Sequence, residues 1–215
     1  MGLLRPVAPD RRMLLQEIDE FRTFLAGNPR AERAQFLPFF NARDQLFAFL
    51  ATFNNAVLEP DHVAHEFALW GDFVCDTLSG SKRNGAFVLI EFEDASVTSL
   101  FRRLPGRRVS RWGVRVEAGL SQVTDWLFRL DRARNSSEME RDFGTRQLRP
   151  LGLVVAGRRS EVTPYDLERL NWRSEHTVVG GAQIGIMTYD DLLDWLEGRV
   201  SLVKGLDEEG EAQVS

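Results

Sequence analysis

Three acidic residues have the types and spacing to act together: Asp72, Glu91 and Glu93. Side chains alternate along a strand, so Glu91 and Glu93 are expected on one face of the apolar run Ala86–Phe92. Two carboxylates on that face are desolvated, and each raises the proton affinity of the other. A divalent cation relieves both costs, and carboxylate oxygens suit Mg²⁺ or Mn²⁺. The pattern predicts a metal site formed by Asp72, Glu91 and Glu93.

The third acid, Asp72, is expected to come from the preceding strand. Asp72 opens an apolar stretch, and residues 79–85, rich in serine and glycine, predict a hairpin connection to the next strand. We expect this hairpin to bring Asp72 beside Glu91. Each acid also has a plain structural explanation: Asp72 can be a turn residue after Gly71, and Glu93 can be a strand-end acid facing solvent.

A run of arginines follows these acids. Between Arg102 and Arg115 the chain carries six arginines and no acidic residue. Guanidinium groups bind phosphates with two hydrogen bonds, so the run predicts contact with a DNA backbone. The residues assigned to this contact are Arg102, Arg103, Arg107, Arg108 and Arg111. A solvated loop or a protein-binding surface remains an alternative, because a net charge of −5 disfavours tight non-specific DNA binding at physiological salt.

The elements that must position these residues follow from periodicity and turn signals. Helical spacing of apolar residues covers 14–25, 44–54 and 119–134, and strand-like runs cover 63–69, 72–78, 86–92, 151–156 and 183–187. Thr163-Pro164 and Thr188-Tyr189 begin two further helices. A meander followed by helical crossovers predicts an α/β domain with a mixed sheet flanked by helices. The boundaries are an N-terminal helical section over 1–56, a core over 57–200 and an acidic, disordered tail over 201–215.

The cysteine count and the lengths of the apolar runs indicate the cellular compartment. The single cysteine, Cys75, excludes an intramolecular disulfide and fits a reducing compartment. The first residues do not form a signal peptide, and the apolar runs are far too short to span a bilayer. We therefore expect a soluble, cytoplasmic protein with no membrane partner.

Several strings in the chain together resemble a known family. The segments 71–74 and 90–93 resemble the Asp…Glu-X-Lys core of PD-(D/E)XK nucleases. Residues 119–126 resemble the helix after that core, with its Gln-X-X-X-aromatic pattern. The strings Gly157-Arg158-Arg159 and Thr188-Tyr189-Asp190-Asp191-Leu192-Leu193 are more specific and resemble the end of the C-terminal nuclease domain of Shedu anti-phage proteins.

This resemblance implies a fold, a site and an activity. The fold would be of the restriction-endonuclease type, with Asp72 and Glu91 as ligands of Mg²⁺ or Mn²⁺ and Gln122 near the metal or the substrate. The activity would be hydrolysis of phosphodiester bonds in DNA, by a homo-oligomeric endonuclease that defends against phage.

One departure from the family pattern leaves two readings open. Glu93 stands where the family has a lysine, so the local charge changes by two units at the place where a phosphate must bind. The second glutamate can act as a base or an extra metal ligand, as in restriction endonucleases that carry Glu-X-Glu. Alternatively, catalysis is lost and the fold serves as a DNA-binding or protein-assembly module.

Overall fold

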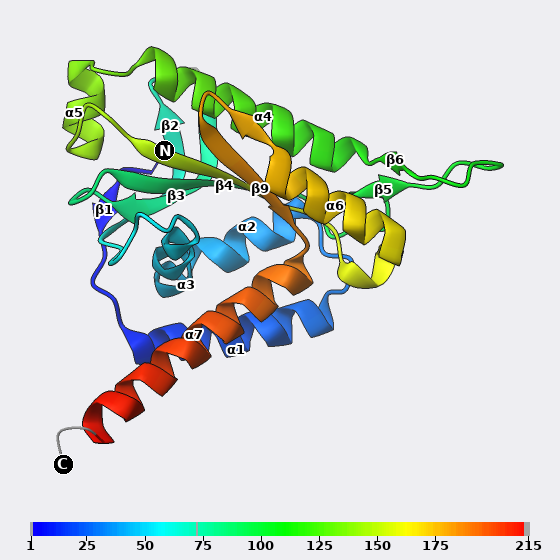
Figure 1. Cartoon of the computed structure of the whole chain (residues 1–215), viewed down its shortest axis with the longest axis horizontal. Coiled ribbons are helices and arrows are strands. Elements are labelled where there is room, and N and C mark those ends of the chain that lie inside the picture. The colour runs from blue at the N-terminus through cyan, green and yellow to red at the C-terminus, as the bar shows by residue number, and fades with distance from the viewer. Residues whose placement is uncertain (1, 72, 213–215) are drawn as a thin grey trace.

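The computed structural model describes residues 2–71 and 73–212, with side chains of the last helix described as far as residue 201 (Figure 1). Its centre is a mixed sheet of seven strands in the order β1-β2-β3-β4-β7-β9-β8, counted over the described residues. The strands of this sheet are β1 (Arg5–Pro6), β2 (His62–Leu69), β3 (Phe73–Ser81), β4 (Ala86–Phe92), β7 (Arg149–Val155), β8 (Val178–Val179) and β9 (Ala182–Met187).

Helices cover both faces of this sheet (Figure 1). The helices are α1 (Arg11–Gly27), α2 (Arg33–Asn41), α3 (Asp44–Leu50), α4 (Val114–Arg132), α5 (Ser137–Phe143), α6 (Pro164–His176) and α7 (Tyr189–Ala212), with short 3-10 turns at Ala51–Phe53 and Arg159–Glu161. Apolar residues of α4, α5 and α6 share one core cluster with the sheet, and those of α1, α2, α3 and α7 share another on the opposite face. The predicted α/β class, with a mixed sheet flanked by helices and a helical N-terminal section, is confirmed.

The centre of the sheet is built from parallel strands. β4 pairs with β7 and β7 pairs with β9, both in parallel, while β2, β3 and β4 form an antiparallel meander. Every residue of β4 is buried, because α4 lies on one of its faces and α2 on the other. A polar side chain on β4 is therefore forced into the interior, as Glu91 is, and Glu93, the first residue after the strand, is buried as well.

The hairpin between β3 and β4 is tighter than the sequence indicates. β3 continues to Ser81, which pairs with Ala86, so the connection spans only residues 82–85. Gly80 belongs to β3, where it pairs with Phe87, and a Cβ there would lie 2.2 Å from the Ala86 oxygen. Gly85 takes a positive φ of 61° and closes the turn. The expected turn over 79–85 was thus placed too early.

Other elements were missed or began elsewhere. α2 was not predicted, because Pro38 lies inside it and proline normally interrupts a helix. Its residues Phe36 and Phe40 are nevertheless fully buried. α4 begins at Val114 rather than at residue 119. Within the arginine run, β5 (Phe101–Arg102) and β6 (Arg111–Trp112) pair as a small antiparallel hairpin that projects from the body of the molecule (Figure 1).

The domain boundaries proposed above remain predictions. The N-terminal helices share their core cluster with β4 and α7, and β1 joins the sheet beside β2. Of the predicted tail over 201–215, the backbone as far as Ala212 belongs to α7. The side chains after residue 201 lie outside the described part of the structure. No helix among the described residues is both long enough and apolar enough to cross a membrane.

Candidate active site

Three carboxylates meet at the carboxyl end of β4. Glu91 belongs to β4, Glu93 directly follows that strand, and Asp76 comes from β3. The last paired residues of this ladder are Thr77 and Ile90. Beyond them, the Phe92 N–H donates to Asp76 Oδ2 at 3.0 Å, which holds the Asp76 carboxylate beside Glu91. The exposed fractions are 4% for Asp76, 0% for Glu91 and 3% for Glu93, so all three acids are buried.

The aspartate described in this cluster is Asp76, which was not singled out from the sequence. The predicted ligand Asp72 lies outside the described residues, so its role stays a prediction. The register of β3 on β4 makes Asp76 the neighbour of Glu91, because the short turn over 82–85 sets the pairing along the strand. The signal was present in the sequence: a four-residue turn over 82–85, which ends with Asn84-Gly85, places residue 76 opposite residue 91.

Burial sets the protonation of these acids. It raises the pKa of Glu91 to about 9, with the nearby Asp76 charge adding to the effect. Burial also raises the pKa of Glu93 to about 7, while the Arg115 guanidinium opposes the change. The pKa of Asp76 is raised by burial against the opposing charge of Arg33. One oxygen of each glutamate, Glu91 Oε2 and Glu93 Oε2, is buried without a hydrogen-bond partner.

A cation from the N-terminal section contacts this cluster. Arg33, the first residue of α2, pairs through Nη2 with Asp76 Oδ1, and its Nε lies 3.8 Å from Glu91 Oε1. Its backbone N–H donates to Asp94 Oδ1 at 2.8 Å, and Asp94 Oδ2 pairs with Arg115 Nε at 2.8 Å. The start of α2 is therefore tied to the end of β4. Sequence reasoning missed Arg33, because its contacts are all distant along the chain.

Helix α4 completes the cluster from above the sheet. Gln122 Nε2 donates to Glu91 Oε1 at 3.0 Å, so the predicted glutamine does lie against the predicted glutamate. One turn earlier, Gly119 faces the strand: a Cβ there would lie 3.4 Å from Glu93 Cγ and 3.5 Å from Glu91 Cγ. The glycine leaves room for both glutamate stems beneath the helix.

The donor chemistry of this cluster fits a hard divalent cation. Its free atoms are carboxylate oxygens, two of them buried without a partner, and burial raises the pKa values of both glutamates. In the described part of the chain, no group of three or more histidine, cysteine, aspartate or glutamate side chains has the arrangement of a metal site. Asp76 is held by Arg33 and the Phe92 N–H, and Glu91 is held by Gln122.

Comparison with known families decides the membership of this chain. Residues 30–193 match the family model described as Shedu protein SduA, C-terminal. The chain belongs to the Shedu family. Membership implies a part in anti-phage defence. No curated protein matches the chain.

The matched Shedu segment includes the two strings on which the resemblance rested, and these strings meet in space. Arg158 Nη2 pairs with Asp190 Oδ1 at 2.8 Å, and Arg159 Nε donates to Asp191 Oδ1 at 2.7 Å. Arg158 Nη1 also donates to the Leu25 oxygen at the end of α1, at 3.0 Å. The strings thus join the end of β7 to α1 and α7. In this Shedu domain they are structural clamps beside the carboxylates.

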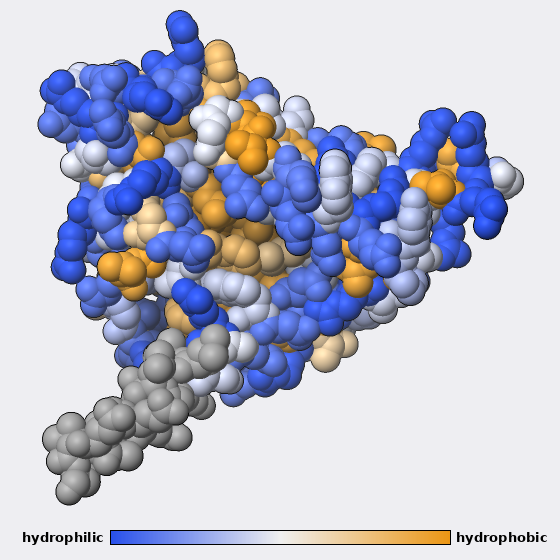
Figure 2. Space-filling view, in the orientation of Figure 1, coloured by the Kyte–Doolittle hydropathy of each residue, from blue (hydrophilic) through white to orange (hydrophobic). Residues whose placement is uncertain are grey.

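The arginine hairpin of the Shedu domain comes between β4 and α4 along the chain. Five arginines on it are exposed and form no ion pair with any described carboxylate: Arg102, Arg103, Arg107, Arg108 and Arg111. Arg115, next along the chain, is instead paired with Asp94. A groove of about 480 Å³ at the base of the hairpin is lined by Arg102, Arg103 and Asp166, among others. Hydrophilic residues dominate the projecting hairpin (Figure 2).

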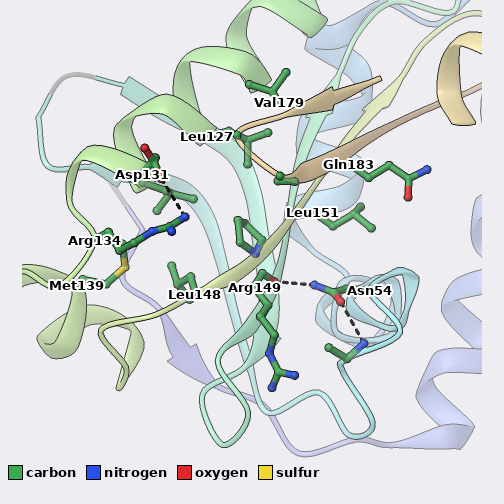
Figure 3. A pocket seen from close by; sticks show the side chains of 16 residues that line it. Asn54, Leu127, Asp131, Arg134, Met139, Leu148, Arg149, Leu151, Val179 and Gln183 are labelled. Carbon is green, nitrogen blue, oxygen red and sulfur yellow. Dashed lines mark hydrogen bonds and ion pairs between the residues drawn. The ribbon is translucent and has the colours of Figure 1, made fainter. Parts of the chain in front are cut away.

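A second cavity of the Shedu domain lies away from the acids. It has a volume of about 350 Å³ and is lined by Asn54, the end of α4 and the loop before β9 (Figure 3). Asn54 Nδ2 donates to the Arg149 oxygen at 2.8 Å. Arg149 pairs with Ala86 at the start of β4, whereas Glu91 pairs with Val154 near its end. This cavity therefore opens at the opposite end of the sheet and plays no part in the carboxylate cluster.

Proposed function

We propose that this Shedu-family chain is a metal-dependent DNA endonuclease of the PD-(D/E)XK type, which hydrolyses phosphodiester bonds in anti-phage defence. The observation that carries the proposal is the burial of Asp76, Glu91 and Glu93 together at the end of β4, which is followed along the chain by a hairpin of unpaired arginines. Burying three carboxylates costs free energy that packing alone does not return. Such a cluster is typical of a site that binds a cation and a phosphate.

Each residue has a role that its position supports. Asp76 and Glu91 would hold a Mg²⁺ or Mn²⁺ ion, and such an ion polarises a phosphodiester and makes water more acidic. Gln122 positions the Glu91 carboxylate through its hydrogen bond to Oε1. Glu93, with a pKa of about 7 and one free oxygen, accepts a proton from the attacking water near neutral pH. The unpaired arginines of the hairpin bind the DNA backbone on either side of the cut.

These roles give a function to Glu93, which stands where the family pattern has a lysine. A glutamate in the lysine position supplies a base, and the positive charge near the phosphate comes from arginines on other elements. The proposal keeps DNA as the partner. Assembly into homo-oligomers, which the family resemblance implies, remains a prediction.

The experiment is DNA cleavage by purified protein with Mg²⁺ or Mn²⁺, on linear and supercoiled DNA. We expect cleavage that depends on the metal and falls by about 100-fold or more in Asp76→Asn and in Glu91→Gln, because each substitution removes a charged ligand. The matched control is Glu66→Gln, on the neighbouring strand β2, where the side chain is exposed. This control is expected to cut like the unchanged protein.

A different result would reverse the proposal. If the unchanged protein cuts neither DNA form with any divalent metal, the chain is an inactive nuclease fold kept for DNA binding or assembly. If it cuts and both Asp76→Asn and Glu91→Gln cut equally well, the active site lies elsewhere.

A further inference from the structure

Arg33 contacts the carboxylates in a way that the proposed function does not yet use. Its guanidinium pairs with Asp76 Oδ1 and lies 3.8 Å from Glu91 Oε1, so it lies where a cation shared by these two acids would be attracted. The Arg33 side chain is 40% exposed, whereas the side chains of Asp76 and Glu91 are 5% and 0% exposed. One side of the guanidinium therefore faces solvent while the other neutralises buried acids.

The backbone of Arg33 is fixed at the start of α2. Its N–H donates to Asp94, and the preceding Glu32 forms a capping box with Gln35 at the start of α2. Phe36, one turn along, stacks on Tyr189 with ring centroids 3.7 Å apart. The long, flexible side chain thus extends from a fixed point, and it can release Asp76 without moving α2.

We propose that Arg33 is the exchangeable cation of this site. In the metal-free protein its guanidinium balances Asp76 and Glu91, and it yields Asp76 Oδ1 when a divalent cation binds. The released guanidinium then lies beside the cluster with its donors free for a phosphate oxygen of the DNA. It supplies from α2 the positive charge that Glu93 does not supply from β4. This inference rests on the proposed metal site, and it concerns a residue to which no role has been assigned.

The exchange predicts how the loss of Arg33 changes the affinity of the site for a divalent cation. An internal cation that must be displaced lowers the apparent affinity of the site for the incoming ion. Removing it should tighten metal binding, whereas a residue that only supports the fold would loosen metal binding when it is removed. Its loss should also weaken DNA binding. These opposite directions mark an exchangeable cation.

The test is a calorimetric titration of Mn²⁺ into Arg33→Gln and into the unchanged protein, both without DNA. We expect Arg33→Gln to bind Mn²⁺ about tenfold more tightly, because the competing ion pair is gone. Arg115→Gln is the control: it removes the same charge nearby, but Arg115 pairs with Asp94 and forms no ion pair with Asp76 or Glu91. We expect less than about threefold change there, from long-range charge alone. Arg33→Lys, which keeps the charge but not the fork, should lie between.

The second measurement is binding of a short DNA duplex in Ca²⁺, which takes oxygen ligands. Arg33→Gln should lose affinity by about fivefold or more although it binds metal more tightly, because a phosphate contact is missing. Thermal unfolding confirms that each variant is folded.

Each outcome decides the inference. If Arg33→Gln binds Mn²⁺ as Arg115→Gln does, or more weakly than the unchanged protein, or if it keeps full affinity for DNA, the inference is overturned while metal-dependent cleavage by the unchanged protein can still stand. If folded protein and variants all fail to bind Mn²⁺, the proposed metal site fails, and the inference fails with it. If only Arg33→Gln binds Mn²⁺, the exchange is supported and the unchanged protein is held metal-free by Arg33.

Discussion

The hydroxyl of Tyr189 donates a 2.5 Å hydrogen bond to the backbone oxygen of Glu93. Tyr189 begins α7 within the string shared with the Shedu family, and it is fully buried. Its ring stacks on Phe36 of α2, one turn after Arg33. A single aromatic side chain therefore links the end of the carboxylate strand to the helix that carries the opposing arginine.

Replacing this tyrosine tests the link. We expect Tyr189→Phe to lower the free energy of unfolding by about 1–3 kcal/mol, because the Glu93 carbonyl oxygen is left buried without its donor. Urea denaturation measures the change. The only other tyrosine, Tyr165, is 56% exposed, and Tyr165→Phe is the matched control with an expected change within about 0.5 kcal/mol. Equal effects of the two substitutions would contradict a structural role for the hydrogen bond.

The raised pKa of Glu93 predicts how stability depends on pH in metal-free protein. The pKa of Glu93 is about 7 in the folded chain, against an ordinary value of 4.5 for a glutamate. Between these values the folded state holds a proton that the unfolded state has lost, so the free energy of unfolding falls as pH rises. Glu91, with a pKa of about 9, adds a fall in the same direction.

Removing the titrating group should flatten this dependence. With a chelator present, we expect Glu93→Gln to be more stable than the unchanged protein at pH 8, by about 1–3 kcal/mol, and the difference to shrink towards pH 5. Urea denaturation across this pH range gives the measurement, and Glu66→Gln is the control. Curves that stay parallel for Glu93→Gln and the unchanged protein would show that Glu93 titrates normally.

The glycine above the glutamates predicts a substitution with an unusual sign. Alanine normally stabilises a helix interior by about 1 kcal/mol relative to glycine. At Gly119 the new methyl would lie 2.9 Å from Val154 Cγ1 and press on both glutamate stems. We expect Gly119→Ala to destabilise the fold, by about 1–3 kcal/mol before the helical gain is counted.

A second helical glycine provides the comparison. Gly198 in α7 is exposed, and a Cβ there would meet nothing within 4 Å. Thermal unfolding measures the stability of both variants, and Gly198→Ala should be neutral or stabilising. A rise in stability at both positions would mean that α4 can move away from the glutamates at little cost.

The unpaired arginines predict a salt-dependent contribution to DNA binding. Neutralising Arg107 and Arg108 together should weaken binding at low salt and reduce the slope of log affinity against log salt by about 1–2, since each phosphate contact contributes about 0.9. Fluorescence anisotropy with labelled duplex DNA in Ca²⁺ measures the slope. Arg12 and Arg132, exposed on α1 and α4, provide a double variant of equal charge change. An identical slope in both double variants would assign the hairpin to a different partner.

The sequence by itself determined the class of fold and half of the site. Period-two alternation places Glu91 and Glu93 on one face whatever the surroundings, because it follows from strand geometry alone. The arginine run, the capping signals at Thr163 and Thr188, and the Shedu strings are likewise local patterns. They could be read without knowing what packs against them.

Only the tertiary structure decided which other residues join those glutamates. Asp76 neighbours Glu91 because strand register depends on the length of the turn at 82–85, and a small shift there changes every pair along the ladder. Arg33 reaches the acids only because α2 packs on β4 through Phe36 and Phe40, and no spacing rule connects residue 33 to residue 76. Contacts between distant segments are set by packing of the whole core, which local periodicity does not encode.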